Sequence, residues 1–231
     1  MRGVFVTGTG TEVGKTVVAA AIARSAAAPG RRVAVFKPVV SGLDELNGGP
    51  ADHELLRSAA GSGQTDDEVS PYRYGPGLSP HLAAELKGDV IVPVRLVAAA
   101  RAAASRADLL VCEGVGGFLV PLSAGYLVRD LAIELGLPIV IAAPPSLGTI
   151  NHTLLTVEAV RSAGLEVACV VLTPWPDWPR ELERSNRETI AELGEVPVKV
   201  LPRLDLSRPA SWPRLDLGHR SSSHRVLRRA A

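Results

Sequence analysis

The stretch VFVTGTGTEVGKTVVAAAIA, residues 4–23, decides how this chain folds. It joins a β-branched run to an alanine-rich helical run through a loop that ends in Gly14, Lys15 and Thr16. The common phosphate-binding pattern, G-x-x-x-x-G-K-[ST], would need a glycine at residue 9, but the glycine that closes the strand is Gly8. A G-K-T triplet where a strand meets a helix is the context that confirms such a loop. We therefore interpret the stretch as a phosphate-binding loop with one extra residue; an ordinary strand-turn-helix is the alternative.

Short apolar runs alternate with helical runs along most of the chain. Strands are predicted at 3–8, 32–38, 108–114, 138–144, 166–173 and 198–204, and helices at 15–28, 51–61, 93–105, 128–136, 149–164 and 179–194. The apolar runs are continuous rather than alternating, which is typical of parallel strands covered on both faces. The sequence therefore predicts an α/β fold: a doubly wound, mostly parallel sheet of the P-loop NTPase type, in three α/β/α layers.

Composition bounds the domain and its surroundings. We expect residues 1–204 to form a single P-loop α/β domain, and residues 205–231, which end in a basic run, to form a disordered C-terminal tail. The net charge of +1 gives no reason to expect nucleic acid as a partner. No apolar run is long enough to span a membrane, and both cysteines stand in apolar strand-like runs. We therefore expect a cytoplasmic protein without membrane contact.

Charged residues stand where the predicted strands end. Lys37 follows the second strand, Glu113 ends the third, and Asp52 opens a helix between them. Ligands of open α/β sheets bind at the carboxyl ends of the strands, so we expect these side chains beside the loop. With Thr16, the two acids form a set of hard oxygen ligands that suits Mg²⁺. Taken singly, Lys37 also fits a surface lysine, and Asp52 a carboxylate that favours a helix start.

Four segments occur in order: VTGTGTEVGKT (6–16), FKPVVSG (36–42), CEGVGGFLVPL (112–122) and LGTINHTLLT (147–156). Together they resemble the dethiobiotin synthetase family, from residue 3 to about residue 204. The resemblance implies an ATP-dependent cyclo-ligase that uses Mg²⁺ and closes the ureido ring of dethiobiotin from 7,8-diaminononanoate and CO₂. It also implies that one amine captures CO₂ as a carbamate, which takes the γ-phosphoryl group, and that the second amine then closes the ring.

The resemblance further implies the role of each matching residue. The catalytic residues are Lys37 and Lys15, and the Mg²⁺ ligands are Thr16, Asp52 and Glu113. The nucleotide-binding residues are Glu12, Val13, Gly14, Lys15, Thr16, Val17, Asp52, Glu113, Gly114, Val115, Gly116, Thr173, Pro174, Pro202, Arg203 and Leu204. The substrate residues are Thr11, Lys37, Ser41, Gly148, Thr149, Ile150 and Asn151. The last four would come from a second subunit, so the resemblance implies a homodimer whose active site spans the interface; simple helix capping is the alternative for them.

Three positions in the loop separate the alternatives. A partitioning-type P-loop ATPase would carry a second lysine five residues before Lys15, where this chain has Gly10. A nucleotide-binding regulatory module would show a damaged loop, whereas Lys15 and Thr16 are both present. Many members of the resembled family carry Asn at the position of Thr173, where its amide can pair with adenine; threonine cannot make that pair. We therefore expect weak discrimination among nucleoside triphosphates.

Overall fold

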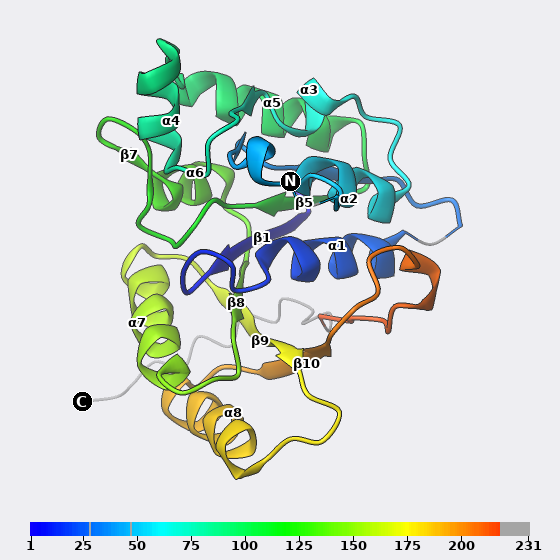
Figure 1. Ribbon diagram of the computed structural model, residues 1–231, viewed down its shortest axis with the longest axis vertical. Coiled ribbons are helices and arrows are strands. Elements are labelled where there is room, and N and C mark those ends of the chain that lie inside the picture. Colours follow the sequence, from blue (N-terminus) through cyan, green and yellow to red (C-terminus); the bar gives the residue numbers. More distant parts are fainter. Residues whose placement is uncertain (28, 47, 218–231) are drawn as a thin grey trace, which may run out of the picture.

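The computed structural model describes residues 1–27, 29–46 and 48–217. Its core is a six-stranded sheet in the order β10-β9-β8-β1-β5-β2, and every neighbouring pair is parallel. The strands are β1 (Gly3–Gly8), β2 (Val33–Phe36), β5 (Leu109–Glu113), β8 (Ile139–Ala143), β9 (Val167–Trp175) and β10 (Val198–Pro202). The predicted parallel α/β sheet is therefore confirmed (Figure 1).

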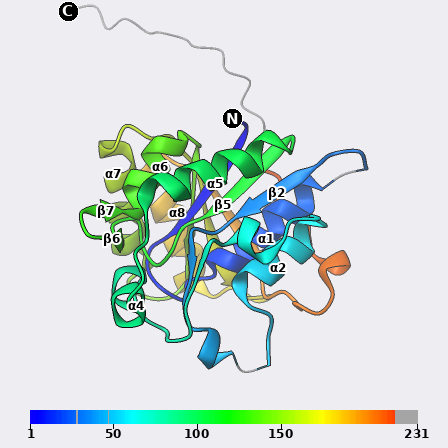
Figure 2. The same ribbon diagram turned by 90° about the horizontal axis from the view of Figure 1, so that it is seen from above.

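Helices cover both faces of this sheet (Figure 2). One face carries α1 (Lys15–Ala26), α2 (Asp52–Ala60) and α3 (Asp66–Val69). The other carries α4 (Pro80–Lys87), α5 (Pro93–Ser105), α6 (Val128–Leu135), α7 (Thr149–Ser162) and α8 (Glu181–Gly194). Successive strand residues point to opposite faces, so Phe5 joins one core and its neighbours Val4 and Val6 the other. Both faces need apolar residues, which explains the continuous apolar runs.

Several short elements were not predicted. β3 (Val39–Val40) pairs in parallel with β4 (Tyr72–Arg73), and β6 (Pro121–Ser123) pairs antiparallel with β7 (Tyr126–Leu127). Single 3₁₀ turns lie at η1 (Leu43–Glu45) and η2 (Pro209–Ser211). The sequence prediction left 62–92 without elements, and that region holds α3, β4 and α4. Apart from α4, which has eight residues, the missed elements have two to four residues and show no periodicity, so a pattern search misses them.

The outer edge of β2 meets a side chain rather than another strand. The side-chain amide of Gln64 accepts a hydrogen bond from Val35 N at 2.8 Å and donates one to Val35 O at 3.0 Å. Gln64 lies in the loop that joins α2 to α3, and Ser62 Oγ donates to the same amide oxygen at 2.9 Å. The loop is thereby fastened to the edge of the sheet.

The segment 205–217 corrects the prediction of a disordered tail that begins at residue 205. Trp212 and Leu215 are buried against the α1 side of the sheet. Trp212 Nε1 donates to Asp205 O at 2.7 Å, and Leu215 N donates to Ser25 Oγ at 2.8 Å. Burial of these spaced apolar side chains orders the segment. Residues 218–231, also predicted to be disordered, lie outside the described residues, and the single-domain assignment stays a prediction.

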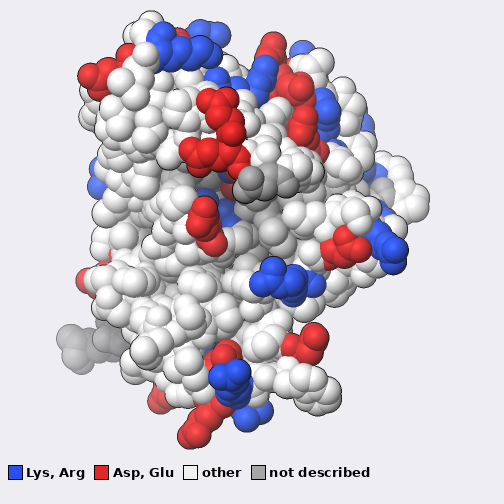
Figure 3. Space-filling model, viewed as in Figure 1, with Lys and Arg blue, Asp and Glu red and all other residues white. Residues whose placement is uncertain are grey.

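The described surface carries charges of both signs. On the face shown in Figure 3, acidic and basic side chains are interspersed. Of the helices in the described part of the chain, none has the length and apolar character needed to cross a membrane.

Candidate active site

The loop between β1 and α1 forms a tight turn at the start of a helix. Gly14, which precedes α1, has φ 85°, in the left-handed region. A Cβ atom at this position would lie 2.6 Å from Thr173 Cγ2, so only glycine fits there. Glu12 also has a positive φ, 58°. The backbone amides at the start of α1 form the positive end of its helix dipole. Such a helix start is a site for phosphate or another anion.

Lys15 reaches back across this loop. Its Nζ donates to Gly10 O at 2.7 Å. Burial lowers the pKa of Lys15, and the positive charge of Lys37 adds to this effect, while the Glu113 carboxylate opposes it. The ammonium group of Lys15, which is predicted from the sequence to bind the phosphates, therefore donates to the carbonyl oxygen of Gly10 instead.

Lys37, Asp52, Glu113 and Thr16 converge beside the loop, from four different segments. Lys37 Nζ donates to Glu113 Oε1 at 2.6 Å and to Asp52 Oδ2. Thr16 Oγ1 donates to the same Glu113 oxygen at 2.9 Å. The side chains of Lys37 and Glu113 are 5% and 0% exposed. The structure thus brings together all three predicted Mg²⁺ ligands and the predicted catalytic lysine in one cluster, the Lys37 cluster.

Burial and pairing set the charges of this cluster. Burial alone would lower the pKa of Lys37, but Glu113 and Asp52 outweigh it, so the pKa is raised and the side chain stays an ammonium. Burial would raise the pKa of Asp52, but attraction to Lys37 and the hydrogen bond between them lower it. Burial raises the pKa of Glu113 in spite of Lys37. The cluster is an ion-paired triad that holds one more carboxylate than ammonium.

The oxygen atoms of the Lys37 cluster fit a magnesium ion. Glu113 Oε2 is buried and has no hydrogen-bond partner among the described residues. A buried oxygen without a partner is costly unless a ligand meets it. The described residues include no group of three or more His, Cys, Asp or Glu side chains that could hold a metal. Mg²⁺ does not need one, because it is held by one or two carboxylates and keeps water and substrate phosphates as its other ligands.

A groove of about 460 Å³ lies beside the loop. Its walls come from the loop itself, from the turn after β5, and from the exposed side of α7: Gly8, Thr9, Gly10, Thr11, Gly117, Phe118, Leu119, Val120, Leu155, Thr156 and Ala159. Thr11 is the one predicted substrate residue in this wall. No role was predicted from the sequence for the wall residues after Gly116 or for those of α7. Leu119 and Leu155, 54% and 56% exposed, are an apolar signal that only the fold reveals.

The remaining predicted substrate residues, besides Lys37, come from two other segments. Ser41 is half-buried just after β3. Gly148, with φ 89°, precedes α7, whose first residues are Thr149, Ile150 and Asn151. Thr149 is buried and Asn151 is exposed. The segment 148–151 therefore offers the start of a helix, as expected, and its assignment to substrate stays a prediction.

The predicted base-side residues gather where β9 and β10 end. Thr173 is 3% exposed and its methyl group lies against Gly14. Pro174 and Arg203 are exposed, and Pro202 is in register with Trp175. The segment 113–116 lies at the end of β1, where Gly114 N donates to Val6 O at 2.8 Å. The structure thus places both predicted nucleotide segments at the same edge of the sheet as the loop; the contacts with a nucleotide stay predictions.

Two solved structures resemble this fold. A ParA family ATPase from Chlorobium tepidum TLS aligns with a TM-score of 0.56 and 15% identity, over 90% of this chain and 89% of that chain. The cell division ATPase MinD of Pyrococcus furiosus aligns with a TM-score of 0.52 and 19% identity, over 87% and 84%. At such identity the likeness shows the fold alone. It carries no argument for a partitioning function, which Gly10 also disfavours.

Sequence comparison places the chain in a family. A family model described as an AAA domain matches residues 2–211. The ATP-dependent dethiobiotin synthetase BioD of Anaeromyxobacter dehalogenans (strain 2CP-1) is 48% identical over 172 residues, which cover 74% of this chain and 76% of that protein. The protein of the same name from Bacillus subtilis (strain 168) is 37% identical over 205 residues, or 88% of each chain. With the loop and the Lys37 cluster in place, these matches show that the chain belongs to the ATP-dependent dethiobiotin synthetase family.

Proposed function

We propose that this chain is a cytoplasmic, Mg²⁺-dependent dethiobiotin synthetase, which closes a ureido ring from 7,8-diaminononanoate and CO₂ and converts ATP to ADP and phosphate. The observation that carries the proposal is the position of Lys37: a buried ammonium between two carboxylates, next to a phosphate-binding loop. Hydrolysis of ATP alone does not call for this second lysine, whereas transfer of phosphoryl to an anionic acceptor does.

The loop and the two carboxylates would hold the triphosphate. Amides at the start of α1 would bind the phosphates, and Lys15 would exchange Gly10 O for β- and γ-phosphate oxygens. Thr16, Asp52 and Glu113 would hold Mg²⁺, which when bound neutralises charge on those oxygens. Glu113 would orient its free Oε2 toward this position.

The reaction needs positioning and charge neutralisation but no protein nucleophile. One substrate amine adds to CO₂ and loses a proton, which gives a carbamate. A carbamate oxygen then forms a bond to the γ-phosphorus as the bond to ADP breaks. The second amine attacks the carbonyl carbon, phosphate leaves, and the ring closes with the loss of a further proton. Lys37, whose raised pKa keeps it charged, would stabilise the carbamate and the transferring phosphoryl group.

The groove beside the loop supports the substrate assignment. Thr11 and apolar residues such as Leu119 and Leu155 line it, and the substrate combines two amines with an apolar chain. The substrate carboxylate would bind the start of α7 of a second subunit, at Gly148, Thr149, Ile150 and Asn151, with Ser41 as a further contact. The active enzyme would then be a homodimer with two shared sites.

The base side would discriminate weakly among nucleoside triphosphates. Thr173 is buried against Gly14 and has no amide to pair with adenine. Pro174, Pro202, Arg203 and Leu204 would surround the base without a bidentate contact. A comparison of kcat/KM for ATP, GTP and CTP tests this, and a preference for ATP of several hundredfold would contradict it.

An assay of ADP formation tests the reaction itself. The purified chain with Mg²⁺ and ATP is expected to release ADP only when both 7,8-diaminononanoate and bicarbonate are present. Equal release without the diamine would favour an ATPase, and no release under any condition would favour a nucleotide-binding regulatory module.

Mixing two inactive variants tests the shared site. Lys37→Met removes the ammonium of one subunit, and Gly148→Val strains the left-handed turn before α7, whose φ is 89°. Since each active site would combine the two segments from different chains, a heterodimer regains one intact site, and random mixing restores about a quarter of wild-type activity. Activity at the level of the separate variants would show that each subunit works alone.

A further inference from the structure

One ammonium group pairs with both carboxylates that the proposed function assigns to the metal. Lys37 Nζ contacts Asp52 Oδ2 and Glu113 Oε1, the latter at 2.6 Å. The Lys37 side chain is 5% exposed, so water does not share these contacts to any large extent. Lys37 thus acts as the counter-ion of both acids, at the position between them that a bridging cation would take.

The hydrogen bonds around Glu113 are unevenly distributed. Its Oε1 accepts from both Lys37 and Thr16, while its Oε2 has no partner among the described residues. Mg²⁺ requires close, near-octahedral oxygen contacts at about 2.0–2.1 Å. An ammonium and a divalent ion that share the same carboxylates repel each other, and they do so strongly at the buried Glu113, where little solvent screens them. Both cations cannot keep their full set of contacts with Asp52 and Glu113.

We infer that Lys37 and the divalent metal exchange places on Asp52 and Glu113, so that metal entry releases the lysine toward the phosphoryl group. This inference rests on the metal assignment of the proposed function. Its consequence is that the charge of Lys37 reaches the reacting atoms only when the metal is bound. The competing arrangement keeps Lys37 on both acids throughout and gives the metal only Thr16 and the free Glu113 oxygen.

Binding of Mn²⁺ without nucleotide distinguishes the two arrangements. Lys37→Met removes the charge and opens both carboxylates. Lys15→Met is the matched control, because Lys15 also carries a buried charge near Glu113 and Asp52 but donates to Gly10 O instead. Exchange predicts that Lys37→Met binds Mn²⁺ at least about tenfold more tightly than wild type, and Lys15→Met less than about threefold more tightly. Equal changes in both variants, or none, would overturn the inference.

A measurement on the wild-type chain covers the case in which Lys37→Met does not fold. The chain has four lysines, at 15, 37, 87 and 199. Their ¹⁵Nζ signals can be resolved by NMR after lysine labelling, and those of the exposed Lys87 and half-buried Lys199 serve as internal references. Saturation with Mg²⁺ alone is expected to shift the Lys37 signal and reduce its protection from exchange. A Lys37 signal that stays unchanged at saturation would refute the exchange while leaving the diamine-dependent ADP assay untouched.

Discussion

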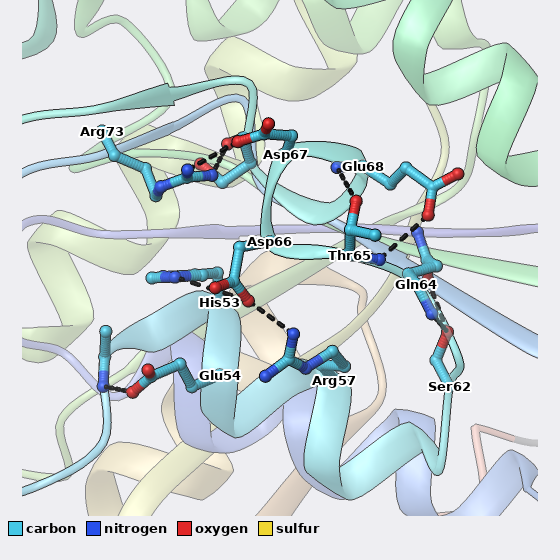
Figure 4. A network of polar contacts seen from close by, with 12 residues as sticks. His53, Glu54, Arg57, Ser62, Gln64, Thr65, Asp66, Asp67, Glu68 and Arg73 are labelled. Atoms are coloured by element: carbon cyan, nitrogen blue, oxygen red, sulfur yellow. Dashed lines mark hydrogen bonds and ion pairs between the residues drawn. The ribbon is translucent and has the colours of Figure 1, made fainter.

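Two polar networks share helix α2, and they differ in burial. The Lys37 cluster uses Asp52 at the start of the helix. The second, the Asp66 network, includes His53 and uses Arg57 in the last turn: Arg57 Nη1 donates to Asp66 Oδ1 at 2.6 Å, and His53 Nε2 lies 3.9 Å from the same oxygen (Figure 4). The side chains of Asp66 and Asp52 are similarly exposed, 42% and 41%, so the difference lies in Glu113, which is 0% exposed, and its partner Lys37.

The difference supports the proposal that the Lys37 cluster, rather than the Asp66 network, serves a ligand. The Asp66 network also contains two separate contacts near solvent. Thr65 and Glu68 bond to each other in a capping box, and Asp67 pairs with Arg73. Such exposed pairs contribute little and position α3 against α2. The Lys37 cluster costs desolvation and leaves an oxygen of the Glu113 carboxylate buried without a described partner, whereas the buried atom without a described partner in the Asp66 network is an imidazole nitrogen, His53 Nδ1.

Cavity size alone would favour the Asp66 network. A cavity of about 690 Å³ lies between the α2–α3 loop and α5, lined by Gly61, Ser62, Gln64, Ala99 and Arg106 among others. It is larger than the groove of about 460 Å³ beside the phosphate-binding loop. Among its charged residues, Glu68 and Arg106 pair with each other at 2.6 Å. A buried carboxylate oxygen without a described partner, rather than the volume of a cavity, distinguishes the candidate active site.

The largest expected effect is on the Lys37 cluster. Lys37→Met is expected to lower kcat by about three or more powers of ten while nucleotide still binds, because the ammonium acts on charge that develops during transfer. Single-turnover kinetics and nucleotide titration measure the two quantities. Lys87→Met, at an exposed lysine, is the control and should leave kcat unchanged. An unaltered kcat in Lys37→Met would show that the lysine has a structural role, like the ion pairs of the Asp66 network.

Gly14→Ala tests the turn that supports the Lys37 cluster. The new Cβ would meet Thr173 Cγ2 at 2.6 Å in a backbone with positive φ, so nucleotide affinity should fall about a hundredfold. Thr173→Ser removes the methyl group and should recover part of that loss in the double variant. Full affinity in Gly14→Ala, measured by calorimetry, would show that the turn adapts.

A pH series tests His53, which joins the Asp66 network from the buried side. Burial lowers the pKa of His53, with Asp66 opposing. The unfolded state therefore binds the proton more readily, and the stability contributed by neutral His53 is full above the unfolded pKa and is lost as pH falls through the folded pKa. His53→Gln should flatten the decline in the free energy of unfolding between pH 8 and 5, roughly the range where histidine titrates. His81→Gln, at an exposed position, should not.

The smallest effect is expected from Arg57→Met. The Arg57 side chain is 35% exposed and its partner Asp66 is 42% exposed, so the change should cost only about 0.5–1 kcal/mol of unfolding free energy. Urea denaturation measures this loss, and kcat should remain at the wild-type value. A fall in kcat would mean that the two networks on α2 are coupled.

Much of the fold and the centre of the site could be predicted from local sequence. The continuous apolar runs specify a sheet buried on both faces, and the strand ends locate Lys37 and Glu113. Contacts between distant segments could not be predicted in this way. The groove wall combines the turn at 117–120 with α7, and Leu215 is fixed by Ser25, 190 positions earlier in the chain. Such pairs leave no periodic signal, because each partner is ordinary in its own neighbourhood.

The contact between Gln64 and Val35 has a consequence for how copies of this chain can meet. An edge strand with free N–H and C=O groups is a template on which a second chain can extend the sheet. Strand β2 is such an edge, and the Gln64 side chain occupies both hydrogen-bonding groups of Val35 at its outer side. The addition of a strand from a second chain at this edge is therefore blocked at Val35. A second chain cannot continue the ladder of hydrogen bonds through Val35, which protects the chain against open-ended aggregation along β2.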